Sequence, residues 1–302
     1  MKAIVTGALQ PTSDDLAALE KLGLEVTVHP DERAPVPHPE DYEVAVCNNL
    51  FGFHNIDTFS NLKYIQLTAA GMDRVPLDRI REKGIELRNA AGVYSVPMAE
   101  FALWGVLELY KQGRFFAENQ KHRRWEKHRN LRELSGRTVL IVGCGSVGSQ
   151  CARRFSAFGC RCLGLARTGR QQENFEAVHP MDRLEELLPL ADILVLALPL
   201  TEQTRHLLDG AMFARMKTGS ILVNLARGPI VDTEALLDAL SGPLSGAVVD
   251  VFETEPLPEE SPLWDAENLI LTPHNSFVGE HNHQRMMETV LRHLTDFLGR
   301  NR

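Results

Sequence analysis

Long hydrophobic runs are missing from this sequence. The longest, residues 193–200, is less than half of the roughly 20 residues that a helix needs to span a bilayer. Residues 1–7 carry one charge and a short apolar stretch that ends at Gly7, unlike a secretory signal. We therefore expect no membrane association, no secretion and a cytoplasmic location.

Cysteine is scarce, and the five cysteines are Cys47, Cys144, Cys151, Cys160 and Cys162. Their number is odd and no Cys-x-x-Cys pair occurs, which argues against a disulfide framework and against a zinc site. Each lies in an apolar segment, so we expect buried, reduced thiols in a cytosolic protein and no bound metal.

Positive charge is in the minority, with 32 Lys and Arg against 40 Asp and Glu, a net charge of −8. The densest basic stretch, residues 121–129, is short and contains Glu126. We interpret it as a solvated face or a connector, and we expect no nucleic-acid partner.

What the sequence does contain is a regular alternation of short apolar runs with amphipathic stretches, over 302 residues. This alternation is typical of βαβ units and a parallel sheet. The length suits two domains of about 150 residues each. We expect one α/β domain before about residue 98 and a second over residues 99–274, followed by a last helix.

Expected strands cover residues 3–6, 25–28, 44–47, 64–67, 85–88, 139–142, 161–166, 193–197, 221–224, 246–250 and 269–271. Expected helices include residues 13–22, 76–83, 97–112 and 282–298, and residues 143–158 are expected to be a glycine loop that runs into a helix. The run 139–142 has no polar alternation, as in a strand that is covered on both faces.

A glycine loop follows strand 139–142 and opens a helix. Gly143, Gly145 and Gly148 form Gly-x-Gly-x-x-Gly, with Ser146 and Val147 inside it. In this position the first glycine permits a tight turn, the second lets a pyrophosphate approach the backbone, and the third lets helix and strand pack closely. The helix N-terminus then offers its unpaired N–H groups to the phosphates. We therefore expect a dinucleotide site.

The end of strand 161–166 indicates which dinucleotide binds. Ala166 stands where an acidic residue would bind the adenosine ribose, and Arg167, Thr168 and Arg170 follow it. Guanidinium groups in place of a carboxylate suit a 2′-phosphate. We expect a preference for NADP(H), with NAD(H) as the possible second cofactor, unless these arginines are only surface charges.

Three further segments place polar residues after apolar strands: residues 222–232, 249–258 and 271–276. The carboxyl ends of parallel strands are where α/β sheets bind ligands. Together with the glycine loop, these segments closely resemble those of the D-isomer-specific 2-hydroxyacid dehydrogenases, in particular glyoxylate and hydroxypyruvate reductases. The resemblance covers nearly the whole chain, including residues 69–73, 89–93 and 199–204.

The resemblance implies an α/β fold with two doubly wound parallel-sheet domains. The first, over residues 1–98 and completed by residues 275–302, would be a flavodoxin-like substrate domain. The second, over residues 99–274, would be a Rossmann cofactor domain. The implied function is an oxidoreductase that transfers a hydride between NADP(H) and a 2-oxo or D-2-hydroxy acid.

The resemblance also implies catalytic roles. Arg227 matches the arginine that holds the substrate carboxylate and polarises the keto oxygen. His274 matches the general acid and base, since imidazole titrates near neutral pH. Glu255, five residues after Asp250, matches the histidine's carboxylate partner, and its charge favours imidazolium; Glu253 fits that place less well.

Further binding residues follow from the same resemblance. Asp250 matches a contact to the nicotinamide carboxamide, although an Asp at a strand end can also cap the next turn. The remaining positions expected at the cofactor are Pro199, Thr204 and Ala226. The backbone of Ala70 and Gly71 matches a loop that binds the substrate carboxylate.

The substrate itself is less well defined. Residues 48–54 follow a strand and contain no Lys or Arg, which argues against a phosphorylated substrate. Leu50, Phe51, Tyr94 and Phe277 would give the pocket a partly apolar wall, if they are not simply core, and we assign Phe51 to the substrate. A small or medium 2-oxo acid such as glyoxylate, hydroxypyruvate or an aryl pyruvate fits best.

The sequence also bears on the assembly of the protein and on alternative functions. Helix 97–112 is apolar nearly all round and matches a two-fold interface in the family, which predicts a homodimer. A formate dehydrogenase would carry Gln where this chain has Glu255. The alternative from another class is a dinucleotide-sensing corepressor or scaffold with the same fold and no catalysis.

Overall fold

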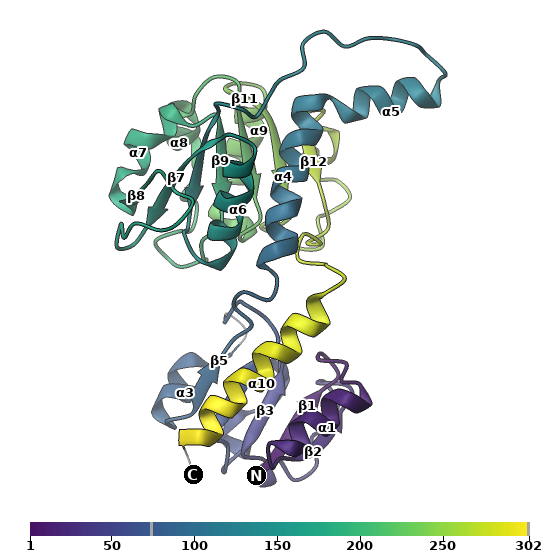
Figure 1. Cartoon of the computed structure of the whole chain (residues 1–302), viewed down its shortest axis with the longest axis vertical. Helices are drawn as coiled ribbons and strands as arrows, with labels where there is room; N and C mark the ends of the chain where they lie inside the picture. The colour runs from purple at the N-terminus through teal and green to yellow at the C-terminus, as the bar shows by residue number, and fades with distance from the viewer. Residues whose placement is uncertain (73–74, 301–302) are drawn as a thin grey trace. The chain divides into compact units, whose positions relative to one another are not determined.

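The computed structural model describes residues 1–72 and 75–300. The chain divides into two compact units, residues 1–94 with 279–302 and residues 95–278 (Figure 1). Each limit lies four residues from the one expected from the sequence, because the long helix after residue 94 belongs wholly to the second unit. Asp73, in the motif at residues 69–73, lies outside the described residues.

The first unit holds a parallel five-stranded sheet in the order β2-β1-β3-β4-β5. Its strands are β1 (Lys2–Thr6), β2 (Glu25–His29), β3 (Val44–Cys47), β4 (Tyr64–Leu67) and β5 (Glu86–Arg88). Its helices are α1 (Ser13–Lys21), α2 (Leu50–Phe53), α3 (Leu77–Glu82) and α10 (Asn282–Arg300), with 3₁₀ turns η1 (Pro39–Asp41) and η2 (Ile56–Thr58).

Both faces of this sheet are covered, which explains its continuous apolar strands. Ala3 and Val5 point to the face where α1 and α10 pack, and the intervening Ile4 points to the face where α2 and α3 pack. Since α1 follows β1 and α2 follows β3, the connections leave these two neighbouring strands on opposite faces. A crevice at the carboxyl ends of β1 and β3 is the consequence.

The second unit holds a parallel seven-stranded sheet in the order β12-β11-β10-β9-β6-β7-β8. Its strands are β6 (Thr138–Val142), β7 (Arg161–Ala166), β8 (Ala177–Pro180), β9 (Ile193–Leu196), β10 (Ser220–Asn224), β11 (Leu244–Val249) and β12 (Leu269–Leu271). Its helices are α4 (Ser95–Lys111), α5 (Gly113–Lys121), α6 (Ser146–Ala157), α7 (Leu184–Leu187), α8 (Gly210–Arg215) and α9 (Thr233–Leu240), with 3₁₀ turns η3 (Met181–Arg183), η4 (Leu188–Leu190), η5 (Gly228–Ile230) and η6 (Pro262–Asp265).

Here too helices cover both faces: α4 and α6 pack on one, and α7, α8 and α9 pack on the other. Gly105 allows α4 to approach the sheet, because a Cβ at this position would lie 2.7 Å from both methyl groups of Val248. The expected fold class, two doubly wound parallel sheets, is confirmed.

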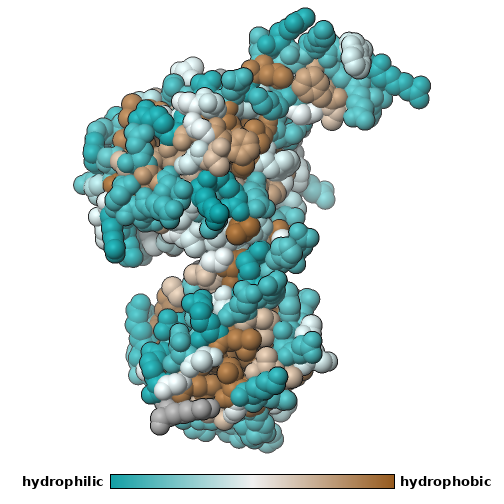
Figure 2. Space-filling model, viewed as in Figure 1, coloured by the Kyte–Doolittle hydropathy of each residue, from teal (hydrophilic) through white to brown (hydrophobic). Residues whose placement is uncertain are grey.

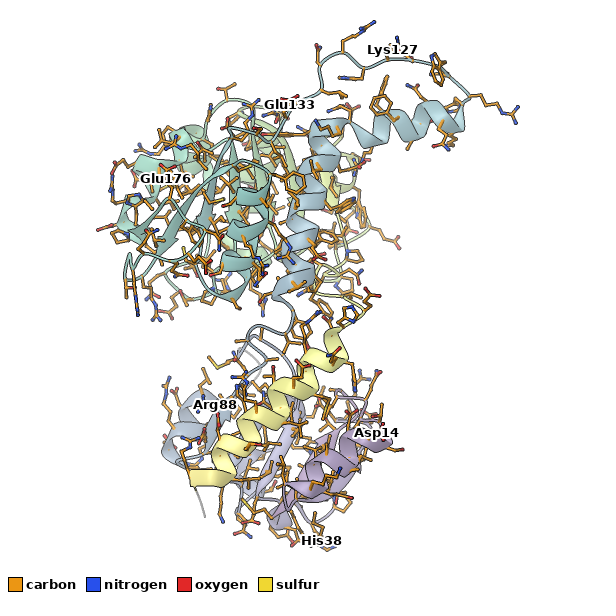
Figure 3. All side chains as sticks on the ribbon, in the orientation of Figure 1. Asp14, His38, Arg88, Lys127, Glu133 and Glu176 are labelled. Atoms are coloured by element: carbon orange, nitrogen blue, oxygen red, sulfur yellow. The ribbon has the colours of Figure 1, made fainter. Side chains whose placement is uncertain are left out.

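Helix α2, strand β8 and helix α5 were not expected from the sequence. Strand β8 lies at the sheet edge and pairs only with β7, so it needs no continuous apolar run. Helix α5 follows α4 after a break at Gln112, whose φ of 55° lies in the left-handed region and ends the first helix. Beyond α5, an extended segment that includes Lys127 returns to β6 (Figure 3), so the basic stretch is a connector.

The five cysteines are all buried and free, as expected. Burial raises the pKa of the Cys151 thiol to about 12, so the thiolate is not formed near neutral pH. Among the described residues, no helix is long and apolar enough to cross a membrane.

Candidate active site

The glycine loop between β6 and α6 is built by close contacts. Gly143 has a φ of +101°, and a Cβ there would lie 2.4 Å from the carbonyl oxygen of Ala197. A Cβ on Gly148 would lie 2.0 Å from the carbonyl oxygen of Gly143. The turn and the close packing of helix and strand therefore both require glycine.

Gly145 lies at the N-cap of α6, and its surroundings are open. No heavy atom lies within 4 Å of the place where its Cβ would be, and no side chain caps the helix. The first-turn N–H groups, from Ser146 and Val147 onward, therefore face a space that a phosphate can enter. These residues fit the pyrophosphate of a dinucleotide.

Ala166 is the last residue of β7, and Arg167, Thr168 and Arg170 follow it as exposed residues. Within the described part of the chain, the guanidinium groups of Arg167 and Arg170 form no hydrogen bond and no ion pair. These two guanidinium groups, which have no carboxylate partner among the described residues, therefore follow the strand whose end meets the adenosine ribose in dinucleotide-binding folds.

The other residues expected at the cofactor lie in two turns at the same edge. The Thr204 hydroxyl donates to the Pro199 carbonyl at 2.9 Å and accepts from the Thr201 N–H at 2.7 Å. The N–H of the buried Ala226 donates to Asn224 Oδ1 at 3.1 Å. Both turns are thus fixed by short local hydrogen bonds.

Three neighbouring strands of the second sheet carry the polar residues expected to be catalytic. Arg227 follows β10, Glu255 follows β11 and His274 follows β12. The backbone ladder continues past the strand ends, since the N–H of Asp250 donates to Asn224 at 3.1 Å and that of His274 donates to the Asp250 carbonyl at 2.8 Å. The loops are therefore held side by side.

His274 and Glu255 form a hydrogen-bonded pair. His274 Nδ1 lies 2.8 Å from Glu255 Oε2, and both side chains are 37% exposed. The other carboxylate oxygen accepts the N–H of Phe252 at 3.0 Å, which fixes the carboxylate. A proton on Nδ1 satisfies this pair and leaves Nε2 to exchange a proton with a ligand.

Asp250 is fully buried and anchors the loop that carries His274. Its carboxylate accepts the Thr272 hydroxyl at 2.6 Å and the N–H groups of Asn275 and Ser276 at 2.7 and 2.9 Å. His274 itself has a φ of 51°, a left-handed conformation that is costly for a residue with a Cβ. Asp250 thus has the turn-capping role that the sequence left open.

Glu253 has different partners from Glu255. Its carboxylate forms a hydrogen bond with His206 Nε2 at 2.7 Å. It also accepts hydrogen bonds from the N–H of Thr233 at 3.1 Å and from the Thr233 hydroxyl. The two glutamates of this segment therefore each hold one histidine, and only Glu255 holds His274.

Arg227 is half-buried and stands directly before η5, with its backbone extended at φ −147° and ψ 143°. Its Nη1 donates to the carbonyl of Ala226 at 2.8 Å. This hydrogen bond orients the guanidinium. The turn itself is also stabilised by the hydrogen bond that Asn224 Oδ1 accepts from the N–H of Ala226.

In the first unit, Ala70 and Gly71 follow β4. Their turn is held by Asn89 Nδ2, which donates to the Ala70 carbonyl at 2.6 Å, and by the Tyr94 hydroxyl, which donates to the Thr68 carbonyl at 2.5 Å. Among the described residues, no acceptor meets the N–H of Ala70 or Gly71. Two backbone donors are therefore open at this sheet edge.

Phe51 belongs to the hydrophobic core of the first unit. Its side chain is 8% exposed, and its ring packs edge-on against Phe59 with the centroids 5.4 Å apart. Leu50 beside it is fully buried. The short helix α2 turns both side chains inward, so the structure favours core over pocket wall, and no role at the substrate is proposed for Phe51.

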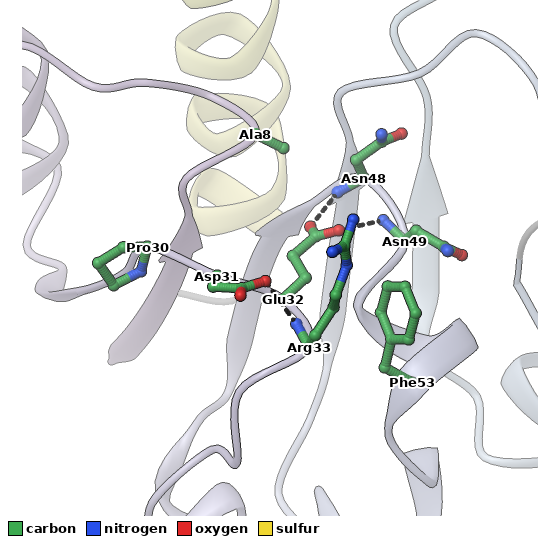
Figure 4. A pocket seen from close by; sticks show the side chains of 8 residues that line it. All are labelled: Ala8, Pro30, Asp31, Glu32, Arg33, Asn48, Asn49 and Phe53. Carbon is green, nitrogen blue, oxygen red and sulfur yellow. Dashed lines mark hydrogen bonds between the residues drawn. The ribbon is translucent and has the colours of Figure 1, made fainter.

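A polar pocket lies at the carboxyl ends of β1, β2 and β3 (Figure 4), and it includes part of segment 48–54, which was expected near the substrate. Its volume is about 280 Å³, and Ala8, Arg33, Asn48, Asn49 and Phe53 are among its lining residues. Glu32 also lines this pocket. The Glu32 carboxylate accepts the Thr6 hydroxyl at 2.7 Å and the N–H groups of Asn48 and Asn49 at 2.6 and 2.7 Å.

Comparison with known proteins places this geometry in context. The family model described as "D-isomer specific 2-hydroxyacid dehydrogenase, NAD binding domain" matches residues 103–276. A glyoxylate reductase of Thermococcus gammatolerans is 32% identical over 314 residues, which cover 98% of this chain and 92% of that protein.

Two solved structures are also similar over almost their full length. A D-isomer specific 2-hydroxyacid dehydrogenase family protein of Aeromonas salmonicida is 30% identical with a TM-score of 0.81, covering 99% of this chain and 95% of that one. A D-isomer specific 2-hydroxyacid dehydrogenase of Xanthobacter autotrophicus, in complex with NADPH and MES, is 28% identical with a TM-score of 0.79, covering 97% and 94%.

Proposed function

Because the chain belongs to the D-isomer specific 2-hydroxyacid dehydrogenase family, we propose that it reduces a small or medium 2-oxo acid to the D-2-hydroxy acid with NADP(H). The observation that carries this proposal is the 2.8 Å contact of His274 with Glu255, on a loop that Asp250 anchors beside the turn of Arg227. The oxidoreductase class follows from the family; the cofactor preference, substrate and residue roles are our proposal.

The glycine loop would hold the dinucleotide, because Gly145 leaves room for the pyrophosphate, Gly143 and Gly148 allow the tight turn and close packing, and the N-terminus of α6 offers its N–H groups. When bound, the reduced nicotinamide supplies the hydride. The Pro199–Thr204 turn and Ala226 line the same edge of the sheet.

Arg227 binds the 2-oxo carboxylate with its guanidinium fork and polarises the keto oxygen. The open N–H groups of Ala70 and Gly71, in the unit of residues 1–94 with 279–302, are also donors for a substrate carboxylate. Donors for an anionic group select 2-oxo acids over simple ketones.

His274 donates the proton from Nε2 to the keto oxygen as the hydride reaches carbon C2, and it takes the proton back in the reverse reaction. Glu255 forms a hydrogen bond with Nδ1, so it fixes the orientation of the ring. Asp250 positions this loop, and a contact of Asp250 with the nicotinamide carboxamide stays a prediction.

NADP(H) is preferred because Arg167, Thr168 and Arg170 lie after β7 without a carboxylate among them. The similar Xanthobacter protein was solved with NADPH, which supports the same cofactor here. NAD(H) remains the second candidate.

The first experiment measures oxidation of NADPH and NADH side by side with glyoxylate, hydroxypyruvate, pyruvate and phenylpyruvate. We expect turnover with NADPH preferred. His274→Ala should lose about 10²- to 10⁴-fold in kcat, the usual share of a general acid. His206→Gln is the matched control, because His206 also holds a glutamate and has a similar exposure, 42%.

The possible results separate the parts of the proposal. Preference for NADH would remove the role of the arginines and leave the reaction standing. Tight dinucleotide binding without turnover on any 2-oxo acid would contradict catalysis and favour a dinucleotide-sensing corepressor or scaffold.

We further propose a homodimer that functions in the cytoplasm, with no membrane or nucleic-acid partner. Exposed aromatic side chains lie on α4 and α5, Trp104 at 46% and Phe116 at 39%. Hydrophobic surface is also visible near the junction of these helices (Figure 2). Burial of such a patch between two copies is favourable. Light scattering should give twice the mass of the chain, and Trp104→Glu should lower it; a monomeric wild type would contradict the dimer.

A further inference from the structure

We propose that the polar pocket of the first unit binds the far end of the substrate, and that Arg33 selects 2-oxo acids with a second acidic group. This inference rests on the proposed reduction of 2-oxo acids and goes beyond it, because it names the substrate class. It replaces the expectation of a partly apolar wall.

The position of the pocket supports a ligand site. Ala8 follows β1, Arg33 follows β2, and Asn48 and Asn49 follow β3. In the order β2-β1-β3-β4-β5, the connections from β1 and β3 leave on opposite faces, and doubly wound sheets bind ligands in the crevice that this creates.

The pocket also lies on the same sheet edge as the backbone donors of Ala70 and Gly71. These residues follow β4, and β4 pairs with β3. Since neighbouring strands are about 4.8 Å apart, the crevice beside β3 lies roughly 5–10 Å along the edge from a carboxylate held by those donors. A 2-oxo acid with a chain of three to five further atoms spans such a distance.

The chemistry of the lining favours an anion. Arg33 is exposed, and among the described residues no carboxylate or carbonyl meets its guanidinium. The side-chain amides of Asn48 and Asn49 are half-buried and have no partner within that same part of the chain. The guanidinium has five N–H donors and each carboxamide has two, so these lining residues carry nine donors.

The two acidic residues of the pocket, Asp31 and Glu32, do not bind the Arg33 guanidinium. Both oxygens of the Glu32 carboxylate accept hydrogen bonds from the Thr6 hydroxyl and the N–H groups of Asn48 and Asn49. Asp31 Oδ1 accepts the backbone N–H of Arg33 at 3.0 Å and so fixes the turn that presents the guanidinium (Figure 4).

Glu32 keeps the pocket in shape. Its three hydrogen bonds tie the loop after β2 to the ends of β1 and β3, and His54 Nε2 lies 2.8 Å from its carbonyl oxygen. Arg33 is the next residue, so its Cα is held while its side chain extends into the pocket.

The test compares two substrates of one shape: 2-oxoglutarate and 5-methyl-2-oxohexanoate, in which an isopropyl group replaces the terminal carboxylate. We expect wild type to prefer the diacid in kcat/KM by about tenfold to a hundredfold, the range for a charged hydrogen bond. Arg33→Ala should remove this preference, Arg33→Lys should restore part of it, and Arg33→Glu should reverse it.

Arg81→Ala is the matched control, an exposed arginine on α3 that is not part of the pocket. Glyoxylate has no distal group, so its turnover should be the same in all these variants. An equal ratio of the two substrates in wild type and Arg33→Ala would overturn the proposal, as would a preference for a 2-oxo acid that ends in an amine.

Binding is measured as well, by calorimetry of both compounds on the full chain saturated with NADP⁺. If glyoxylate is not turned over, the proposed function fails; diacid binding that depends on Arg33 would still support the pocket. If wild type shows neither a binding difference nor a kinetic difference between the two compounds, the pocket proposal is wrong, while turnover of glyoxylate would still support the reductase.

Discussion

The two units have their proposed ligand sites at the carboxyl edges of parallel sheets, but the sites consist of different groups. In the second unit the proposed phosphate site consists of backbone, with Gly145 open and Gly143 and Gly148 close to other backbone atoms. In the first unit the pocket consists of side chains that Glu32 holds together. A backbone site leaves a motif in the sequence, whereas a side-chain site assembled from three loops leaves none.

Besides Asp250, two carboxylates connect strands, one at the carboxyl ends of the first sheet and one at the amino ends of the second. Glu32 ties the carboxyl ends of the first sheet. Asp192, just before β9, accepts the N–H of Thr138 at the start of β6 at 2.9 Å and Lys217 Nζ at 2.7 Å, so it ties the amino ends of the second. Only the first of these anchors lies beside a proposed ligand site.

Among the substitutions that test this contrast, the largest effect should come from closing the backbone site. Gly145→Ala adds a methyl group to open space, so the fold should be unchanged, while NADPH affinity should fall about tenfold to a hundredfold because the methyl occupies the phosphate position. Gly148→Ala should instead lower the melting temperature, since its Cβ would meet Gly143. Calorimetry and thermal melts distinguish the two, and unchanged affinity in Gly145→Ala would refute the assigned phosphate position.

The next effect should come from Glu32→Gln. The amide keeps one acceptor oxygen but turns an NH₂ group toward an N–H donor, which costs about 2 kcal/mol. We expect a higher KM for diacids with kcat nearly unchanged, and NADPH affinity as in wild type. Glu20→Gln, exposed on α1, serves as control. A fall in kcat with constant KM would contradict a positioning role in substrate binding.

Asp192→Asn should lower stability and leave the kinetics alone. Burial alone raises the pKa of Asp192, but hydrogen bonds from Lys217 and Thr138 and the charges of Lys217 and Arg137 hold it below its ordinary value. The stabilisation is therefore present above the unfolded pKa of about 4 and is lost as the pH falls through the lower folded value.

Melts of wild type and Asp192→Asn at pH 7 should differ by about 1–2 kcal/mol in unfolding free energy and should converge toward pH 3. Asp238→Asn, on the exposed side of α9, is the control. A gap between the two proteins that persists at pH 3 would show that the carboxylate charge is not what stabilises the sheet.

The smallest effect should come from Arg167→Ala. Loss of one guanidinium should reduce the NADPH-to-NADH ratio in kcat/KM by about tenfold, since Arg170 stays in place. Arg153→Ala, on the exposed face of α6, is the matched control. An unchanged ratio would place the 2′-phosphate elsewhere.

The same contrast explains what could be predicted from the sequence. Strands covered on both faces, such as β6 and β9, are continuous apolar runs and were found; β8, an edge strand that mixes Ala177, Val178 and His179, was not. The glycine loop was found because its residues are adjacent in the chain.

Glu32 and Arg33 were not found because their partners are distant in the chain. Glu32 accepts hydrogen bonds from Thr6, Asn48 and Asn49, which are 26, 16 and 17 positions away in the sequence, and only the folded sheet brings these loops together. Residue type alone also does not tell Glu253 from Glu255, as each holds a histidine. The position relative to Asp250, taken from the family resemblance, selected Glu255.

Helix α10 has a consequence for how the chain is made. The first unit is closed by a helix from the far end of the chain, with the Phe297 ring 4.6 Å from that of Tyr64. The second unit is one continuous segment and can complete its core while synthesis is still in progress. The ribosome needs about 10–40 s for the roughly 200 residues from 94 to the end of α10. During that time the sheet of the first unit lacks one cover, so the order of folding is inverted: the later unit is finished first, and the nascent N-terminal sheet is the part that chaperones must protect.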